Sequence, residues 1–396
     1  MSYQIVRFPY DGTIDADGHV LEPPTLWETY LEERYRDRAL RIRVDDAGFE
    51  YLDIGGKPSE RTRGGSLGLL GAMGDPAAKP APERRYATSM PFGAGDAAER
   101  IELLAHENLD KSVLYPTIGL LWECELEDPE LTLAYQRAYN RWIADFCRES
   151  DGRLVPIAHV SLLDPAGAAD ELERAVGDGC KGAFVAPFTH TRKAHGHPDH
   201  DALWARAVAL DVPVAIHPTF EPFWAAPVRF KRLGRPREFF YNVMLRQGVQ
   251  QAFLSFIALG TLDRFPALRL GVLESGSGWI GSFLDRADAV AGTDRAMADL
   301  KRTPSDYFRT QCFISGDPDE TAAAHIVDHV GADCFMWATD YPHPDHPGTW
   351  AHALERFVAP LSPATRAKVL GRNVARIYKL DRSVEPASPP RHNASS

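Results

Sequence analysis

The alternation of short apolar runs with longer amphipathic segments is the feature that most constrains how these 396 residues can fold. Eight runs are rich in Val, Ile, Leu and Phe, and most are nearly continuous in apolar character, as in parallel strands covered on both faces. They occupy residues 13–19, 111–116, 154–160, 180–186, 212–218, 268–275, 312–315 and 334–340. Eight strands that are each followed by a helix predict a closed (β/α)8 TIM barrel.

Helix-start signals lie between these runs. Each places a capping Asp or Ser before a proline, whose fixed φ suits the first helical position. The four signals are Asp128-Pro129, Asp164-Pro165, Asp317-Pro318 and Ser362-Pro363. A doubly wound open sheet is the alternative fold, but it usually has fewer strands and a glycine-rich phosphate turn after the first one. The sequence DGHVLEPP, at the end of the first run, contains no such turn.

Two regions fall outside this repeat. In residues 41–95, an alternating pattern with a Gly-Gly turn (RIRVDDAGFEYLDIGG) precedes a stretch rich in Gly, Pro and Ala. This region predicts a small β-hairpin and a long loop inserted after the first strand. Residues 383–396 are rich in Pro and Ser and predict a disordered tail. We therefore expect residues 1–382 to form a single barrel domain.

Charge and cysteine content restrict the partners and the compartment. A formal net charge of −11 argues against nucleic acid or an anionic membrane as the main partner, and favours a small-molecule substrate. The longest apolar run, FLSFIALG, is too short to span a bilayer, and the N-terminal residues show no secretory signal. The five cysteines are scattered without CxxC spacing, which predicts reduced thiols in a cytoplasmic protein.

Polar side chains gather where the predicted strands end, and the active site of a TIM barrel lies at those carboxyl ends. The first strand ends in Asp17 and His19, the fifth in His217, the sixth in Glu274 and the eighth in Asp340. Two His and two Asp around one opening predict a divalent metal site with a position left for water or substrate. We expect a single ion, because Lys181 begins the fourth strand and so lies at the far end of the barrel.

Each of these residues also has a structural explanation when it is taken alone. Asp15 would share a face of a regular strand with the two first-strand candidates, yet its expected role is a hydrogen bond beneath the site. His217 could be a core histidine, and Asp340 could begin a turn. Glu274 could cap the next helix. The structural explanations together require that all these residues meet on one face by accident.

Other histidines form two further groups. Residues 190–200 hold four histidines (His190, His195, His197 and His200) within THTRKAHGHPDH, where Gly and Pro predict a solvent-exposed loop near the pocket mouth. His343 and His346 follow Asp340 on the expected catalytic face, and we expect His343 in particular to contact the substrate.

Five stretches of the chain resemble the amidohydrolase superfamily, in particular the amidohydrolase-2 group that includes aminocarboxymuconate-semialdehyde decarboxylase and γ-resorcylate decarboxylase. They are TIDADGHVLEP, VPVAIHPT, FPALRLGVLESGSGWI, FMWATDYPHPD and VLGRNVARIYKL, spread from Thr13 to Leu380. The resemblance implies a metal-dependent barrel enzyme that forms a homodimer. It also implies that the metal ligands are Asp17, His19, His217 and Asp340.

The chain departs from the pattern of this group at two positions. Asp17 stands where the first ligand is usually His, which resembles the Glu-x-His variant of some decarboxylases in the group. A more oxygen-rich site shifts the preference toward Mn²⁺, and Zn²⁺ also fits. Glu274 stands where many members carry a catalytic His.

Three functions are compatible with this site. The first is non-oxidative decarboxylation of an aromatic or unsaturated carboxylic acid, in which Glu274, buried near apolar side chains such as Trp279, delivers the proton to carbon. The second is metal-dependent hydrolysis of an amide, lactone or C–C bond, in which Asp340 takes a proton from an activated water. The third is a barrel that binds a small molecule without turning it over. The acidic first ligand favours the decarboxylase by resemblance, whereas Glu274 in place of His weakens that case. The candidate catalytic residues are Glu274, Asp340 and His343.

Overall fold

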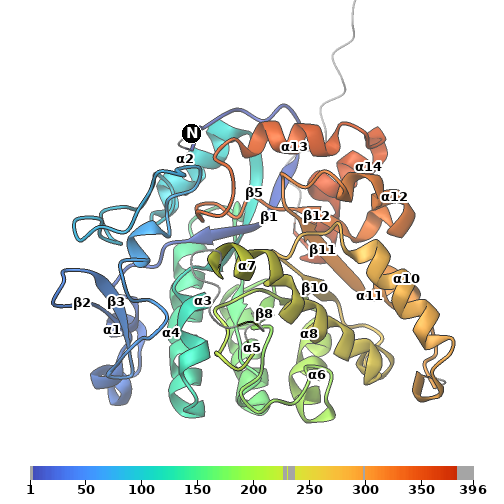
Figure 1. Ribbon diagram of the computed structural model, residues 1–396, viewed down its shortest axis with the longest axis horizontal. Coiled ribbons are helices and arrows are strands. Elements are labelled where there is room, and N and C mark those ends of the chain that lie inside the picture. Colours follow the sequence, from blue (N-terminus) through green and yellow to red (C-terminus); the bar gives the residue numbers. More distant parts are fainter. Residues whose placement is uncertain (1–2, 226–229, 231–236, 298, 381–396) are drawn as a thin grey trace, which may run out of the picture.

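The protein folds into a ring of parallel strands with helices around it (Figure 1). The computed structural model describes residues 3–225, 230, 237–297 and 299–380, and the predicted tail at 383–396 lies outside them. The strands of the ring are β1 (Thr13–Val20), β5 (Leu109–Pro116), β6 (Leu154–Pro156), β7 (Ala158–His159), β8 (Ala183–Val185), β9 (Val214–Ile216), β10 (Leu270–Val272), β11 (Cys312–Gly316) and β12 (Phe335–Trp337). Each of the eight predicted runs coincides with one position in the ring, because β6 and β7 share the third run.

The ring closes into a barrel, as the sequence predicts. Hydrogen-bonded neighbours follow the order β1, β5, β6 and then β7, β8, β9, β10, β11, β12, and all of these pairs are parallel. Only Ile157 separates β6 from β7. The last gap closes where the Asp340 N–H donates to the Asp17 carbonyl at 2.9 Å and the His19 N–H donates to the Tyr341 carbonyl at 2.7 Å. The (β/α)8 fold is confirmed, and two segments that carry candidate ligands are joined directly.

Helices cover the outside of the barrel (Figure 1). They are α1 (Leu26–Tyr30), α2 (Ala97–Glu107), α3 (Gly119–Trp122), α4 (Pro129–Cys147), α5 (Pro165–Asp178), α6 (Asp201–Leu210), α7 (Arg237–Met244), α8 (Arg246–Ala258), α9 (Thr261–Arg264), α10 (Ile280–Ala291), α11 (Pro304–Gln311), α12 (Val327–Val330), α13 (Trp350–Val358), α14 (Pro363–Ala367) and α15 (Asn373–Ile377). Asp128, Asp164 and Ser362 cap α4, α5 and α14 by accepting hydrogen bonds from backbone N–H groups, as predicted.

The fourth predicted helix start, Asp317-Pro318, is wrong. Residues 317–322 form turns, and the next helical residues are the 3₁₀ turn Ala323–His325. In this segment the Glu320 side chain accepts hydrogen bonds from the backbone N–H groups of Ser277 and Gly278, at 2.7 and 2.9 Å. A contact with a distant turn therefore overrides the local helix signal.

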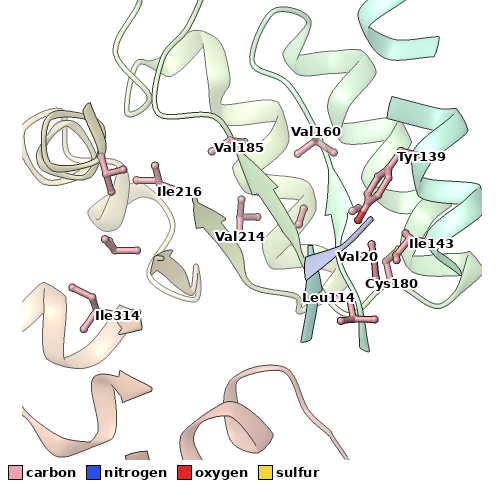
Figure 2. Packing of buried hydrophobic residues seen from close by; sticks show 14 of the residues in the cluster. Val20, Leu114, Tyr139, Ile143, Val160, Cys180, Val185, Val214, Ile216 and Ile314 are labelled. Atoms are coloured by element: carbon pink, nitrogen blue, oxygen red, sulfur yellow. The ribbon is translucent and has the colours of Figure 1, made fainter. Parts of the chain in front are cut away.

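Strand side chains alternate between two apolar layers. Tyr115, Phe184 and Ala215 belong to a buried cluster inside the barrel. Val185 and Ile216 belong to the larger cluster between the strands and the helices, part of which Figure 2 shows. Because the period of a strand is two residues, the alternation that turns Ala215 inward also turns His217 inward.

The segment inserted after β1 forms a small antiparallel sheet. β2 (Arg41–Val44) pairs with β3 (Glu50–Ile54), and β3 pairs with the short β4 (Lys57–Pro58). The Gly-Gly pair at 55–56, with φ of 61° and 86°, makes the turn between β3 and β4. Further along, the Arg61 guanidinium lies 4.4 Å from the centre of the Phe223 ring. The insertion thus reaches the loop that follows β9.

The cysteines are structural. All five are buried, and none forms a disulfide. Burial raises the pKa of Cys124 and of Cys180 to about 12, which keeps these thiols protonated and unreactive. Among the described residues, no helix is both long enough and apolar enough to cross a membrane.

Candidate active site

β1 brings Asp17 and His19 to the carboxyl end of the barrel, but its pairing is irregular. The register with β5 shifts between Asp15 and Gly18, which breaks the alternation that would place Asp15 beside the other two. The Asp15 carboxyl instead accepts hydrogen bonds from Ser112 Oγ at 3.0 Å and Thr339 Oγ1 at 2.7 Å. Asp15 therefore links β1 to β5 and to the residues that follow β12.

His19 and His217 each present one ring nitrogen to the barrel interior. The Nδ1 atom of His19 lies 2.7 Å from the Pro116 carbonyl oxygen, and the Nδ1 atom of His217 lies 2.7 Å from the Pro218 carbonyl oxygen. A carbonyl only accepts, so both Nδ1 atoms carry a proton, and in a neutral imidazole the Nε2 atom then presents a lone pair. Neither Nε2 atom has a hydrogen-bond partner, although both are buried. Histidine metal ligands are oriented by this kind of hydrogen bond on the other nitrogen.

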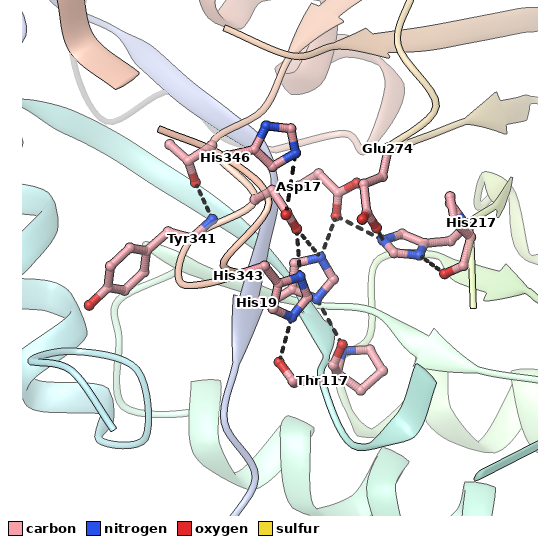
Figure 3. A network of polar contacts seen from close by, with 12 residues as sticks. Asp17, His19, Thr117, His217, Glu274, Tyr341, His343 and His346 are labelled. Carbon is pink, nitrogen blue, oxygen red and sulfur yellow. Dashed lines mark hydrogen bonds and ion pairs between the residues drawn. The ribbon is translucent and has the colours of Figure 1, made fainter. Parts of the chain in front are cut away.

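Asp17 lies between the two imidazoles. Its Oδ1 atom is 3.5 Å from each Nε2 atom, and its side chain is fully buried. Neither of its carboxylate oxygens has a hydrogen-bond partner, and Figure 3 shows the three side chains converging. A buried carboxylate without a donor is costly unless a cation or a proton neutralises it. The unpartnered nitrogen and oxygen atoms of this cluster fit a divalent cation.

Asp340 joins the cluster from the segment after β12. Its Oδ1 atom lies 3.0 Å from His19 Nε2 and 2.8 Å from His343 Nδ1. The other ring nitrogen of His343 lies 3.0 Å from the Thr117 hydroxyl (Figure 3). Burial opposes protonation of His343, but the adjacent Asp340 outweighs it and raises the pKa of the imidazole. Burial likewise opposes the charge of Asp340, yet the adjacent His343 holds its pKa well below the usual range. Asp340 and His343 thus form an ion pair at the edge of the ligand set.

Glu274 brings a further carboxyl to the same place. Its Oε2 atom lies 3.2 Å from His217 Nε2 and has no hydrogen-bond partner. Burial, and then the charge of Asp340, raise the pKa of this carboxyl well above its ordinary value, which favours the protonated form. The Glu274 backbone has φ of 41°, a left-handed conformation that is uncommon for a residue with a side chain and concentrates at functional sites. The Trp279 indole N–H donates to the Gly276 carbonyl at 2.8 Å and closes the turn after Glu274.

The structure adds Glu22, which the sequence does not single out, and shows where His346 lies relative to Asp340. The Glu22 carboxyl is buried and accepts hydrogen bonds from the backbone N–H groups of residues 117–119, which fixes the loop that carries Thr117. His346 Nε2 lies 3.4 Å from Asp340 Oδ2. Burial opposes its charge, yet the surrounding carboxylates raise the pKa of His346 to about 9. The sequence points to His346 because it follows Asp340 closely in the chain. Nothing in the sequence points to Glu22, because its hydrogen-bond partners are backbone groups.

A second imidazole–carboxylate pair lies on the inner wall of the barrel. His159 Nε2 is 2.7 Å from Glu123 Oε2, and both side chains are buried. The His159 ring stacks on Phe184 with centroids 4.5 Å apart, and Phe184 lies 5.7 Å from the His217 ring. The sequence conceals this pair, because His159 lies within an apolar run and Glu123 belongs to a different segment.

The prediction of a solvent-exposed loop at residues 190–200 is wrong for three of its four histidines, since the His190 side chain is only 5% exposed. His195 and His200 are buried. His195 Nε2 lies 2.8 Å from the Ala186 carbonyl oxygen, and His200 Nδ1 lies 3.1 Å from the His195 carbonyl oxygen. Gly196 lets the loop pack closely on α8, since a Cβ there would lie 2.2 Å from the Ser255 carbonyl oxygen. The two imidazoles therefore hold a folded loop.

Comparison with known sequences places these features among amidohydrolases. A family model described as amidohydrolase matches residues 120–380. The γ-resorcylate decarboxylase of Rhodococcus jostii is 28% identical over 298 residues, which cover 72% of this chain and 87% of that protein. The γ-resorcylate decarboxylase of a Rhizobium species is also 28% identical, over 269 residues that cover 65% of this chain and 79% of that protein.

Solved structures share the barrel. An amidohydrolase from Mycobacterium avium subspecies paratuberculosis has a TM-score of 0.78 at 20% identity, covering 93% of this chain and 99% of that one. A 5-carboxyvanillate decarboxylase from Novosphingobium aromaticivorans, solved with bound manganese, has a TM-score of 0.66 at 18% identity, covering 95% of this chain and 100% of that one. At these identities the likeness establishes a common fold.

Proposed function

The chain belongs to the amidohydrolase family, and from that premise we propose that it is a metal-dependent, non-oxidative decarboxylase of an aromatic carboxylic acid. The observation that carries the proposal is the carboxyl of Glu274, whose buried Oε2 atom has no hydrogen-bond partner and lies 3.2 Å from His217 in the candidate ligand set. Decarboxylation replaces CO₂ by a proton, so the site needs an acid that holds a proton as the C–C bond breaks. Similarity to γ-resorcylate decarboxylases and to a manganese-bound 5-carboxyvanillate decarboxylase supports this choice.

Asp17, His19 and His217 would hold the ion, with Asp340 beside them. Their fit to a cation rests on buried nitrogen and oxygen atoms that no donor or acceptor satisfies. When bound, a divalent cation supplies positive charge that polarises a carboxylate and a neighbouring phenolic or carbonyl oxygen of the substrate. Carboxylates combined with imidazoles suit Mn²⁺ or Zn²⁺.

The protein's own residues would orient the substrate and deliver the proton. His343, fixed between Asp340 and Thr117, presents a positive charge of fixed position to an anionic substrate. Glu274 would protonate the ring carbon as CO₂ leaves and would then regain its proton from solvent. The site side chains are at most 12% exposed, which excludes water and favours a proton from Glu274 over one from solvent during the step.

Hydrolysis of an amide, lactone or C–C bond is the second candidate function. The observation that favours it is Asp340, whose pKa is held low by His343, so that it is ionised beside the ligand set. An ionised carboxylate in this position could accept a proton from an attacking water.

Isotope-labelled turnover distinguishes the two functions. The purified protein, loaded with Mn²⁺ or Zn²⁺, is incubated with a panel of hydroxybenzoic acids and aryl amides in D₂O or in ¹⁸O-water. Decarboxylation releases CO₂, places deuterium on the carbon that lost the carboxylate and puts no solvent oxygen in the aromatic product. Hydrolysis places ¹⁸O in a product and releases no CO₂ from the acids.

Glu274→Gln tests the acid. Gln has the same size but does not donate a carboxyl proton, so we expect kcat to fall by about 100-fold or more, with unchanged metal content. Glu107→Gln is the matched control, because Glu107 is also buried but lies beside Tyr3 and Trp350 rather than in the site. A Glu274→Gln enzyme with parental kcat would show that another group supplies the proton.

We also propose that residues 1–382 form one domain and that the protein is a cytoplasmic homodimer. Large apolar side chains in the segment after β9 support self-association, since Phe223 and Phe239 are 60% and 74% exposed. Light scattering on the purified protein tests the dimer.

A further inference from the structure

A carboxylate outside the site holds the turn that carries Glu274. The turn has the sequence ESGSG, at residues 274–278, and lies between β10 and α10. Glu320, from the loop after β11, accepts hydrogen bonds from the Ser277 N–H and the Ser277 hydroxyl, both at 2.7 Å, and from the Gly278 N–H at 2.9 Å. All three bonds end on one carboxylate, so the turn cannot shift relative to β11 without breaking them.

Two glycines leave the space for this contact. Gly276 has φ of 66°, and a Cβ there would lie 2.9 Å from Glu320 Oε1. A Cβ on Gly316, at the end of β11, would lie 2.6 Å from the Ser277 hydroxyl oxygen and 3.1 Å from Glu320 Oε2. The turn, β11 and the Glu320 carboxylate are therefore packed as closely as glycine permits.

Glu274 begins this turn in an uncommon backbone conformation. Its φ of 41° is unfavourable for a residue with a side chain and persists only where the surroundings enforce it. The Glu274 N–H donates to the Ser315 hydroxyl at 3.2 Å, which fixes the start of the turn, and Glu320 fixes its end. With both ends of the turn held by residues of β11 and of the loop after it, the Glu274 carboxyl lies 3.2 Å from His217 Nε2.

We infer that Glu320 is a positioning residue for Glu274, which keeps the strained turn in the conformation that directs the acid toward the ligand set. This inference rests on the proposed role of Glu274 as the acid. A simpler role for Glu320 is to stabilise the start of α10, because the N–H groups of Ser277 and Gly278 lie just before that helix. A helix cap contributes to stability alone, whereas a positioning residue also determines where the Glu274 carboxyl lies and how fast the reaction runs.

Two variants and one control separate these roles. Glu320→Ala removes the acceptor of all three hydrogen bonds. Glu320→Gln keeps the shape of the side chain, but its NH₂ group must face at least one of the N–H donors and cannot accept from it. Asp164→Ala removes a carboxylate cap from α5, where Asp164 accepts the Gly167 N–H at 3.0 Å, without contacting the turn.

Crystal structures of the Mn²⁺-loaded parent and variants give the first measurement, which needs no substrate. We expect the Glu274 carboxyl to move away from His217 by about 1 Å or more in both Glu320 variants, a displacement large enough to cost about 100-fold in rate. It should not move in Asp164→Ala. An unmoved Glu274 carboxyl in the Glu320 variants overturns the inference, whatever reaction the enzyme catalyses.

Kinetics on the acid that the panel identifies give the second measurement. We expect kcat to fall by about 10- to 100-fold in the Glu320 variants with little change in KM, and both constants to stay parental in Asp164→Ala. In a Glu274→Gln background, the Glu320 substitutions should cost no further kcat, because they act through Glu274. Additive losses in the double variants overturn the inference. Failure of the proposed function is recognised separately, because the isotope-labelled turnover would then release no CO₂ from the acids. Failure of the acid role is also distinct, because Glu274→Gln alone would keep the parental kcat.

Discussion

Asp15 allows a direct test of how the barrel closes. Its carboxyl is 2% exposed and accepts four hydrogen bonds. Oδ1 accepts the N–H groups of Thr339 and Asp17, at 2.9 and 3.3 Å. Oδ2 accepts the hydroxyls of Thr339 and Ser112, at 2.7 and 3.0 Å. One side chain thus joins the first strand of the barrel to both of its neighbours.

The expected cost of removing this side chain follows from these four bonds. Asp15→Ala leaves four buried donors without an acceptor, and at about 1 kcal/mol for each one the free energy of unfolding should fall by about 3–5 kcal/mol. That is a large fraction of the total free energy of unfolding of a folded protein, which is about 5–15 kcal/mol.

Asp15→Asn should cost much less, about 1 kcal/mol. The amide oxygen can accept the two backbone N–H groups, and the amide nitrogen can donate to the two hydroxyls, which rotate to accept. Burial already raises the pKa of the Asp15 carboxyl, so the loss of its charge contributes little.

Urea denaturation followed by circular dichroism at neutral pH, with the bound metal held constant, measures these free energies of unfolding. Asp46→Ala, at an exposed aspartate in the β2–β3 turn, is the control and should change stability by less than about 0.5 kcal/mol. If Asp15→Ala stays within about 1 kcal/mol of the parent, the hydrogen bonds do not hold the barrel closed. If Asn costs as much as Ala, the lost charge is responsible and the reasoning from hydrogen bonds is refuted.

Three further perturbations test the site and its surroundings. His217→Ala should abolish tight binding of Mn²⁺ or Zn²⁺. Removal of the ion with EDTA should then lower the stability of the parent by about 3 kcal/mol, compared with the parent at an ion concentration 100 times the Kd, and should not change the stability of the variant. Equal effects on both proteins would contradict the site. Burial lowers the pKa of His195 from 6.5 to about 4, so the unfolded chain binds the extra proton between these pH values. His195 should therefore account for roughly 3 kcal/mol of the stability lost as the pH falls through that window, and urea titrations of His195→Gln should show a loss smaller by about that amount. An unchanged pH dependence would contradict the assignment. His159→Phe leaves the Glu123 carboxylate buried and unpaired and should lower the free energy of unfolding by about 3–5 kcal/mol. Adding Glu123→Leu should restore most of this stability in thermal melts, and additive losses would contradict the pairing.

The barrel could be predicted because its strands are buried on both faces and therefore read as continuous apolar runs. The failures have a common physical cause, which is contact between distant segments. The Asp317-Pro318 signal is locally sound, but Glu320 bonds to a turn that precedes it by about forty residues in the chain. The composition of residues 190–200 indicates a loop correctly, yet composition does not show that Gly196 packs against α8 and buries two imidazoles.

The candidate site could be predicted for a related reason. Parallel strands end at one edge of the barrel, so polar residues at the ends of separate runs must meet there, as Asp17, His217 and Asp340 do. Their relation to the backbone could not be predicted. The bulge that separates Asp15 from Asp17 depends on the register with β5, and the carbonyl partners that orient His19 and His217 depend on the paths of two loops.

The way the barrel closes also bears on how a cell makes this protein. Asp17 and His19 emerge from the ribosome early, whereas Asp340 emerges only after all the other barrel strands have been synthesised, so the hydrogen bonds between these segments can form only then. A nascent or prematurely terminated chain therefore lacks the complete set of donors, however well its first half has folded. Only full-length molecules would then bind the ion tightly. Because bound ion stabilises the folded state, the supply of metal in the cell would selectively protect full-length molecules from degradation.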